Sequence, residues 1–220
     1  MLNAETTKFG AGIAISGDRL DLVDLYETIH HFASDHGPIS SQHGEFVLGF
    51  AYDVRHAYQG DRRTKNMQSF GLGSKVDYFE FNAIWIIFLV QLGMLRSAAA
   101  YLINDRSHQS NLYRLEYCVE SALQTVDAKV ANECMRWLGN FTLLPENFLI
   151  NFVSELSGRH LSENTTLKKR ISSLPDYLSC ISMFSSEYKS YENHLKKLAE
   201  AQNCRPEDLI NLSDFPAFKW

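Results

Sequence analysis

The sequence lacks the short motifs that identify the commonest catalytic and nucleotide-binding sites. It contains no G-x-x-x-x-G-K-[ST] phosphate loop, no H-E-x-x-H zinc motif and no G-x-S-x-G nucleophile turn. A dinucleotide-binding G-x-G-x-x-G is also absent, because Gly71-Leu72-Gly73 has no third glycine at the required spacing. No motif therefore fixes a reaction, and whether the chain is an enzyme stays open at this stage.

Cysteine is scarce and widely spaced. None of the four residues forms a C-x-x-C pair or lies near a histidine at zinc-ligand spacing, so the sequence predicts no metal site and no cofactor. Separated cysteines of this kind are typical of reduced thiols in the cytoplasm. The first residues also lack a charged segment followed by an apolar one, so we expect no signal peptide.

Long apolar runs and a strong charge of one sign are missing as well. The longest apolar run, Ala83–Leu95, has about 13 residues, whereas a bilayer of ~30 Å needs about 20. It therefore predicts a buried helix and no membrane partner. The formal net charge of −5 gives no general electrostatic case for nucleic-acid binding.

What the chain does contain is enough apolar and aromatic material for a large core. Hydrophobic residues make up 45% of the sequence and aromatic residues 12%, with 14 Phe and 10 Tyr. At 220 residues we expect a single domain over 1–220, with a C-terminal helical subdomain at 160–220 as the alternative.

Capping signals and apolar periodicity predict the first half of the chain. Residues 9–16 alternate as a short strand would, and Asp21 and Asp24 fit the N-cap and N3 positions of a helix that ends near Asp35–Pro38. The next segments are predicted as a helix at 46–59, with a strand as the alternative, then a basic connection at 60–68 and a short strand at 75–81.

The centre of the chain predicts a buried helical hairpin. Its helices are expected at 82–103 and 108–125, with Ser107 as the cap of the second, and they are followed by a helix at 128–139 capped by Asp127. Further helices are predicted at 145–157, 167–172 and 175–202, with a loop at 157–166 and Pro175 opening the last. The predicted fold class is mainly α (α+β), a helical bundle built on this hairpin with a small N-terminal β element.

The densest polar cluster lies between Tyr52 and Arg63. On a helix, an aspartate can orient a histidine and an arginine can hold a phosphate, so Asp53, Arg55 and His56 are candidate catalytic residues. Arg62 and Arg63 are candidate substrate-binding residues. The alternative interpretation is an ion-paired helix end followed by a solvated basic loop.

The hairpin link at 104–111 is the second candidate, with Arg106 and His108 as substrate-binding residues. Ordinary turn and capping chemistry is its alternative interpretation. Glu27-x-x-His30 has the spacing of a carboxylate-bridged metal site, but such a site needs two copies and only one is present. We therefore predict no metal there.

Three segments together carry a family resemblance: I-S-G-D-x-x-D-L-x-x-L-Y, Y-D-V-R-H-A-Y-Q-G-D-R, and H-Q-S-N-L-Y-R-L-E-Y followed by V-E-S-A-L. Over about residues 10–140 the chain resembles a family of uncharacterised bacterial proteins with no established reaction. The resemblance implies a small cytosolic bacterial protein. It also directs attention to the segment Asp53–Arg63.

Three functions compete on this sequence. The first is a non-enzymatic helical interaction protein, a subunit of a bacterial defence or regulatory assembly or a homo-oligomer, whose tail aromatics Phe215, Phe218 and Trp220 dock on a partner. The second is a phosphodiester-directed, nuclease-like hydrolase that uses the Asp/Arg/His cluster. The third, disfavoured by net acidity, is nucleic-acid binding through basic residues: Arg62, Arg63, Lys65, Lys168, Lys169 and Arg170.

Overall fold

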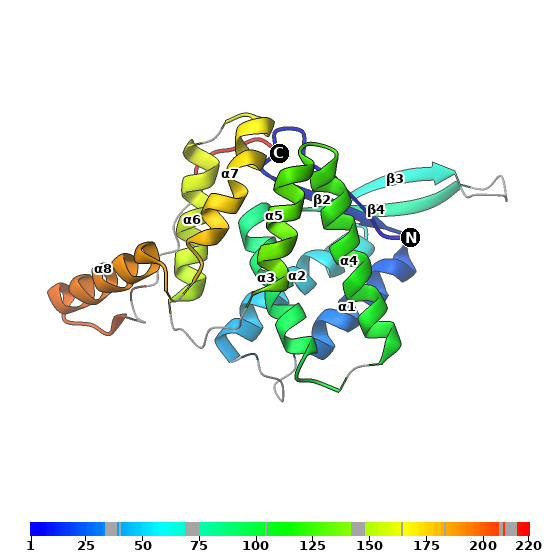
Figure 1. Ribbon diagram of the computed structural model, residues 1–220. Helices are drawn as coiled ribbons and strands as arrows, with labels where there is room; N and C mark the ends of the chain where they lie inside the picture. The colour runs from blue at the N-terminus through cyan, green and yellow to red at the C-terminus, as the bar shows by residue number, and fades with distance from the viewer. Residues whose placement is uncertain are drawn as a thin grey trace.

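The computed structural model describes residues 1–33, 39, 41–68, 75–103, 105–141, 148–163, 165–182, 184–206, 209 and 215–220. These residues form four strands and eight helices (Figure 1). In chain order they are β1 (Asn3–Thr6), β2 (Gly12–Gly17), α1 (Arg19–Phe32), α2 (Ser41–Tyr58), β3 (Arg63–Gln68), β4 (Lys75–Ile84), α3 (Trp85–Ala99), α4 (Arg106–Gln124), α5 (Ala128–Gly139), α6 (Leu149–Glu163), α7 (Leu167–Ser179) and α8 (Ser186–Gln202). The predicted mainly α fold with a small β element is confirmed.

The strands form one antiparallel sheet in the order β1-β2-β4-β3. The predicted strands at 9–16 and 75–81 correspond to β2 and β4, whereas β1 was not predicted. The basic connection expected at 60–68 is wrong for 63–68, which form strand β3. Cross-strand side-chain pairs stabilise β3 against β4; one is the hydrogen bond from the Asn66 amide to the Asp77 carboxylate at 2.9 Å. Local sequence patterns do not reveal such pairs, because the two residues lie on different strands.

Register divides the sheet into two faces. Ile13, Ile15 and Phe81 lie on the inner face, which packs against α1, α2 and α3. Ala14 and Asn82 are register partners on the opposite, outer face. The β3–β4 ribbon projects beyond the helical body (Figure 1).

Helix α1 begins one turn earlier than predicted. Its N-cap is Asp18, whose side chain accepts hydrogen bonds from the amides of Leu20 and Asp21, and Asp21 completes the capping box. Asp21 and Asp24 were predicted instead, because they have the same three-residue spacing as Asp18 and Asp21. The predicted end at 35–38 lies outside the described residues.

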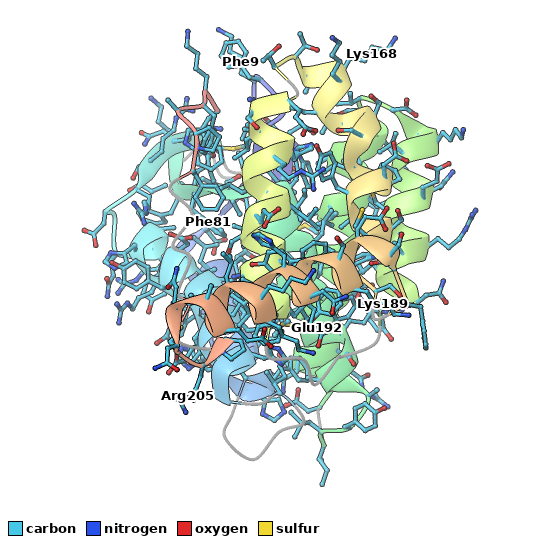
Figure 2. All side chains as sticks on the ribbon, turned by 90° about the vertical axis from the view of Figure 1, so that its left-hand side faces the viewer. Phe9, Phe81, Lys168, Lys189, Glu192 and Arg205 are labelled. Atoms are coloured by element: carbon cyan, nitrogen blue, oxygen red, sulfur yellow. The ribbon has the colours of Figure 1, made fainter. Side chains whose placement is uncertain are left out.

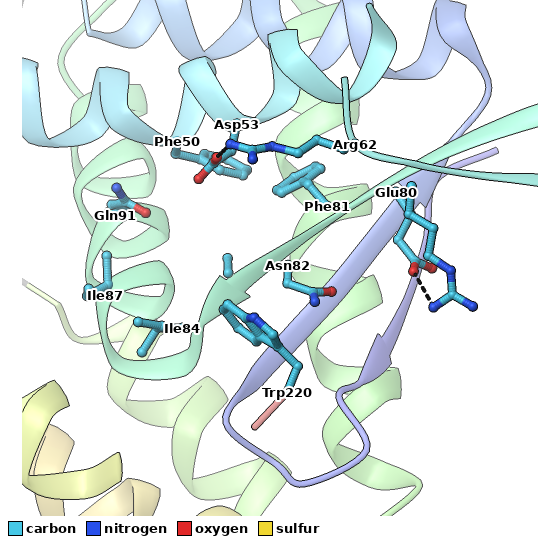
Figure 3. A pocket seen from close by; sticks show the side chains of 12 residues that line it. Phe50, Asp53, Arg62, Glu80, Phe81, Asn82, Ile84, Ile87, Gln91 and Trp220 are labelled. Atoms are coloured by element: carbon cyan, nitrogen blue, oxygen red, sulfur yellow. Dashed lines mark hydrogen bonds and ion pairs between the residues drawn. The ribbon is translucent and has the colours of Figure 1, made fainter. Parts of the chain in front are cut away.

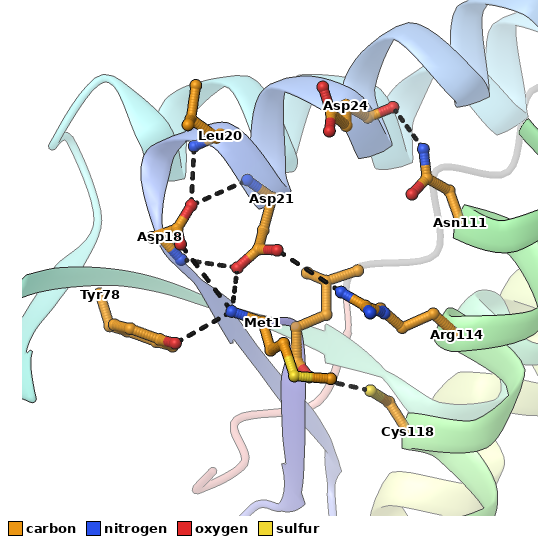
Figure 4. A network of polar contacts seen from close by, with 10 residues as sticks. Met1, Asp18, Leu20, Asp21, Asp24, Tyr78, Asn111, Arg114 and Cys118 are labelled. Atoms are coloured by element: carbon orange, nitrogen blue, oxygen red, sulfur yellow. Dashed lines mark hydrogen bonds and ion pairs between the residues drawn. The ribbon is translucent and has the colours of Figure 1, made fainter. Parts of the chain in front are cut away.

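The start of α1 also anchors the first strand (Figure 4). The Met1 ammonium lies 2.5 Å from Asp21 Oδ2 and donates to the Tyr78 hydroxyl at 3.0 Å. Arg114 approaches the other Asp21 oxygen at 3.7 Å, and Cys118 Sγ donates to the Leu2 carbonyl. One carboxylate thus links β1, α1 and α4.

Helix α3 is the centre of the molecule. Most of its side chains are buried, and it contacts α1, α2, α4, α5, α6 and α7. The predicted hairpin is therefore correct in substance, but residues 82–84 end strand β4 instead of starting the helix. The second hairpin helix is capped by Asp105, not Ser107, while α5 and its Asp127 cap are as predicted.

The C-terminal helices differ most from the prediction. Helix α6 continues to Glu163, so the expected loop at 157–166 is mostly helix, and the predicted start at 145 lies outside the described residues. Pro175 lies inside α7 and opens no helix. Burial of Ile171, Leu174 and Leu178 on one face holds α7 together past the hydrogen bond that proline removes.

Helix α8 packs on α6 through Tyr188 and Tyr191, whose rings lie 5.3 and 5.1 Å from that of Phe152. Its exposed side, with Lys189, is seen in Figure 2. Buried apolar residues from Leu2 to Leu195 form one cluster. The division of the chain into domains nevertheless stays a prediction.

No helix in the part of the chain that the structure describes is long and apolar enough to cross a membrane.

Candidate functional site

A cleft of about 460 Å³ opens beside the start of β3, where β4 continues into α3 (Figure 3). We call it the β4-edge cleft. It lies between α2, α3, the sheet and the C-terminal tail, and it is lined by Phe50, Asp53, Arg62, Arg63, Glu80, Phe81, Asn82, Ala83, Ile84, Ile87, Gln91 and Trp220.

The floor of the cleft is an unpaired strand edge. Strand β3 pairs with β4 only from Lys75 to Glu80, so within the described residues Phe81–Ile84 has a strand partner only on the β2 side. β4 stays extended to Ile84 and pairs with β2 along that length. One strand therefore has a satisfied edge and an open one.

Register identifies which main-chain groups face the opening. The Trp85 amide donates to the Ala11 carbonyl, and Gly12 directs its amide and carbonyl toward Thr7 on the β1 side. In an antiparallel ladder the groups of successive residues alternate between the two edges. Phe81 and Ala83 therefore bond to β2, whereas the amide and carbonyl of Asn82 and the amide of Ile84 point into the cleft. The Ile84 carbonyl belongs to the N-cap of α3 and accepts the first hydrogen bond of that helix.

The inner wall of the cleft is apolar. The Phe50 and Phe81 rings are 5.9 Å apart, and Ile87 extends this surface from the first turn of α3. Gln91 lies at the end of this apolar wall, and its side-chain amide is held by a hydrogen bond that it donates to the Phe46 carbonyl at 2.8 Å. An apolar side chain at this wall would contact Ile87 and the edges of the nearly buried Phe50 and Phe81.

Charged residues at the cleft are paired with one another. Arg62 donates to Asp53 at 2.9 Å. Burial raises the pKa of the Asp53 carboxyl, and the neighbouring Arg62 guanidinium opposes that rise. Arg63 lies 3.3 Å from Glu80, whose other oxygen accepts from Lys65. These contacts neutralise the cleft.

The three predicted catalytic residues do not converge. Asp53 alone lines the cleft, while His56 Nδ1 lies 2.7 Å from Asp61 and the Arg55 guanidinium lies 5.3 Å from the ring centre of Tyr52. The ion-paired helix end that the sequence offered as an alternative agrees with these contacts. A hydrolytic role for the cluster stays a prediction without geometric support.

The hairpin link packs against α1. The His108 ring stacks on His31 with centroids 4.1 Å apart, and His31 Nε2 donates to the Ile103 carbonyl at 3.0 Å. Asn111 donates to the Thr28 hydroxyl at 3.0 Å, and Arg106 is exposed on the first turn of α4. Asn104 lies outside the described residues. The ring contact of His108 and the hydrogen bond of Asn111 therefore join this link to α1.

Basic residues proposed for nucleic-acid binding are largely engaged. Arg62, Arg63 and Lys65 pair with carboxylates, and Arg170 is buried, with only 4% of its surface exposed. Across the described residues, no three or more His, Cys, Asp or Glu side chains are grouped so that they could hold a metal ion.

The tail aromatics differ in their surroundings, since Phe215 and Trp220 are partly exposed and Phe218 is half-buried. The Phe218 and Trp220 rings are 5.0 Å apart, and Trp220 lines the cleft. Asn82 and Ile84 could not be predicted as site residues, because the open edge is defined only once the start of β3 at Arg63 is known. The polar Asn82 before the apolar run was the one available signal.

Comparisons with known proteins give a family but no activity. No curated protein matches the chain, and no solved structure matches it either. The model of the family described as Domain of unknown function (DUF6904) matches residues 2–220. Because that match spans nearly the whole sequence, the chain belongs to the DUF6904 family.

Proposed function

We propose that this protein is a non-enzymatic interaction protein that binds an extended segment of a partner protein as an added strand on β4. The observation that carries the proposal is the open edge at Asn82 and Ile84 in the β4-edge cleft. Strand addition uses main-chain hydrogen bonds for affinity and pockets for alternate side chains for specificity.

The dimensions of the cleft suit a short segment. Four residues of extended chain, Phe81–Ile84, span about 13 Å at roughly 3.3 Å per residue. A segment of four to five residues would bond to Asn82 and Ile84. Its alternate side chains would point to the inner wall at Phe50, Phe81 and Ile87. The proposed partner segment is therefore extended, with apolar residues at alternate positions.

Charge favours contact over catalysis. The cations at the cleft, Arg62 and Arg63, already pair with Asp53 and Glu80. A phosphate would have to displace a carboxylate to bind there, whereas an uncharged main chain would not. The four cysteines are free thiols, consistent with the cytoplasm, where we propose that the protein is a component of a bacterial regulatory or defence assembly.

A random-decapeptide display library tests the proposal. Selection on the full chain should enrich sequences with apolar residues at alternate positions. Binding of a selected peptide should slow amide hydrogen exchange at Asn82 and Ile84. Enrichment of helical amphipathic sequences, or protection confined to other residues, would contradict strand addition.

A matched pair of variants at one position separates main chain from side chain. Asn82→Pro removes a donor that faces the cleft but none from the β2 ladder, and proline is tolerated at such edge positions. Asn82→Ala removes only the side chain. We expect Asn82→Pro to weaken the binding of a selected peptide by about tenfold, because one main-chain hydrogen bond is lost and the peptide carbonyl that accepted it is left unpaired. Asn82→Ala should bind within about threefold of wild type.

A further inference from the structure

The C-terminal tail supplies the outer wall of the β4-edge cleft. Trp220 lies beside Asn82, across the opening from Phe50 and Asp53 (Figure 3). Its side chain is 39% exposed, so part of the ring is buried against the protein and part faces the opening. Trp220 borders the open edge without covering it.

Gly12 on β2, which has no side chain, allows the Trp220 indole ring to lie directly against the sheet. A Cβ atom on Gly12 would lie 3.0 Å from Trp220 Cζ3 and 1.9 Å from the Ala83 carbonyl oxygen. Any larger residue would therefore push both the ring and the β4 main chain away. The ring is also in edge contact with Phe218 in the same tail.

A buried arginine fixes the main chain of the tail. Arg170 donates to the Lys219 carbonyl at 3.3 Å, to Phe9 at 3.0 Å and to Leu161 at 3.1 Å. These contacts tie the tail to the loop before β2 and to α6. Trp220 is thus held at a defined place relative to the strand edge.

Trp220 also borders a second hollow, of about 400 Å³, on the outer face of the sheet. Ala14 and Asn82 lie on that face and line the same hollow. In an added strand, the residue opposite Asn82 directs its side chain to the same face as Asn82. That side chain would lie between the Trp220 ring and the outer hollow.

We infer that Trp220 is the specificity-determining residue of the cleft and selects an aromatic side chain at the partner position opposite Asn82. Aromatic rings 4.5–7 Å apart attract one another beyond the effect of their buried area. The hollow beyond the ring is lined by charged side chains, including Lys8, Arg63 and Glu80, so the aromatic preference rests on the Trp220 ring itself. This inference depends on the proposed strand addition and names the class of residue that the site prefers.

The same display selection, run on four proteins, tests it: wild type, Trp220→Ala, Trp220→Phe and Phe215→Ala. Phe215 is a matched control, because it belongs to the same tail, is 38% exposed and does not line the cleft. Melting curves establish that each variant folds. We expect wild type, Phe215→Ala and Trp220→Phe to enrich an aromatic residue at one fixed position among the alternating apolar ones.

Trp220→Ala should keep the alternating apolar pattern and lose that aromatic preference, and it should bind the wild-type consensus peptide roughly tenfold more weakly. An unchanged aromatic preference in Trp220→Ala would overturn the inference while leaving strand addition intact. Tighter binding by Trp220→Ala would also overturn it, because the tail would then be a cover. Failure of wild type to enrich any extended sequence would overturn the proposed function itself.

Discussion

At the scale of single residues, Asp18 is the clearest determinant of where α1 begins. Its carboxylate accepts hydrogen bonds from two first-turn amides, at 2.9 and 3.0 Å. Replacing an N-cap aspartate by alanine leaves these donors without a partner and costs about 1 kcal/mol. We expect Asp18→Ala to lower the free energy of unfolding by that amount, measured by urea titration.

Asp24→Ala is the matched control for this prediction. Asp24 has the same spacing from Asp21 as Asp21 has from Asp18, but its side chain is exposed and makes no cap. Its replacement should change the free energy of unfolding by less than about 0.5 kcal/mol. Equal losses in the two variants would contradict the capping register described for α1.

The same residues explain why the sequence predicted this helix but not its first turn. Apolar spacing fixes which face of α1 is buried, and this pattern is local in the sequence. The pairs Asp18/Asp21 and Asp21/Asp24 have the same spacing and fit a capping box equally well. The contacts of Asp21 with Met1 and Arg114 distinguish them. Contacts of that kind join residues distant in the chain, so local patterns do not contain them.

At the scale of elements, the α6–α7 pair should respond to pH through one buried imidazole. His160 is fully buried, and its Nε2 donates to the Arg170 carbonyl at 2.8 Å. Burial lowers the pKa of His160 below its ordinary value. Below pH ~6.5 the unfolded chain therefore binds a proton that the folded protein does not, and stability falls as the pH falls.

We expect the free energy of unfolding to decrease between pH 7 and pH 5, by up to about 1.4 kcal/mol per pH unit from this group. His160→Gln should flatten the dependence, because an amide can donate to the same carbonyl without titrating. His194→Gln, at an exposed position on α8, should leave the slope unchanged. A slope that persists in His160→Gln would assign the effect to other groups, including His30, whose pKa burial also lowers.

Elements also show which parts of the fold were predictable. Helix α5 follows directly from its Asp127 cap and apolar spacing, and the apolar run of α3 marks the core. Strand β3 was missed because Arg63, Thr64 and Lys65 have no apolar alternation. Strand β3 is stabilised by Glu80 on the neighbouring strand, and the cleft could not be predicted without knowing that β3 starts at Arg63.

At the scale of the whole molecule, α3 follows directly from strand β4 and contacts the helices α1, α2, α4, α5, α6 and α7. The cleft lies at the start of α3. The edge of β4 that faces β2 lies within the fold, and the opposite edge beyond Glu80 is open. Strand β4 consequently belongs to the folded core along one edge and, along the other, to the surface where we propose that a partner strand binds.

A bound strand should therefore act on the folding equilibrium as well as on the cleft. A ligand that binds only the folded protein, at 100 times its Kd, adds about 2.7 kcal/mol to the free energy of unfolding. For a chain of this size that corresponds to roughly 5–10 °C in Tm. A selected peptide should produce this shift in wild type and a smaller one in Asn82→Pro at the same concentration. An equal shift in both proteins would mean that the peptide stabilises another part of the fold. The open edge of β4 thus provides a thermal assay for partners whose identity is unknown.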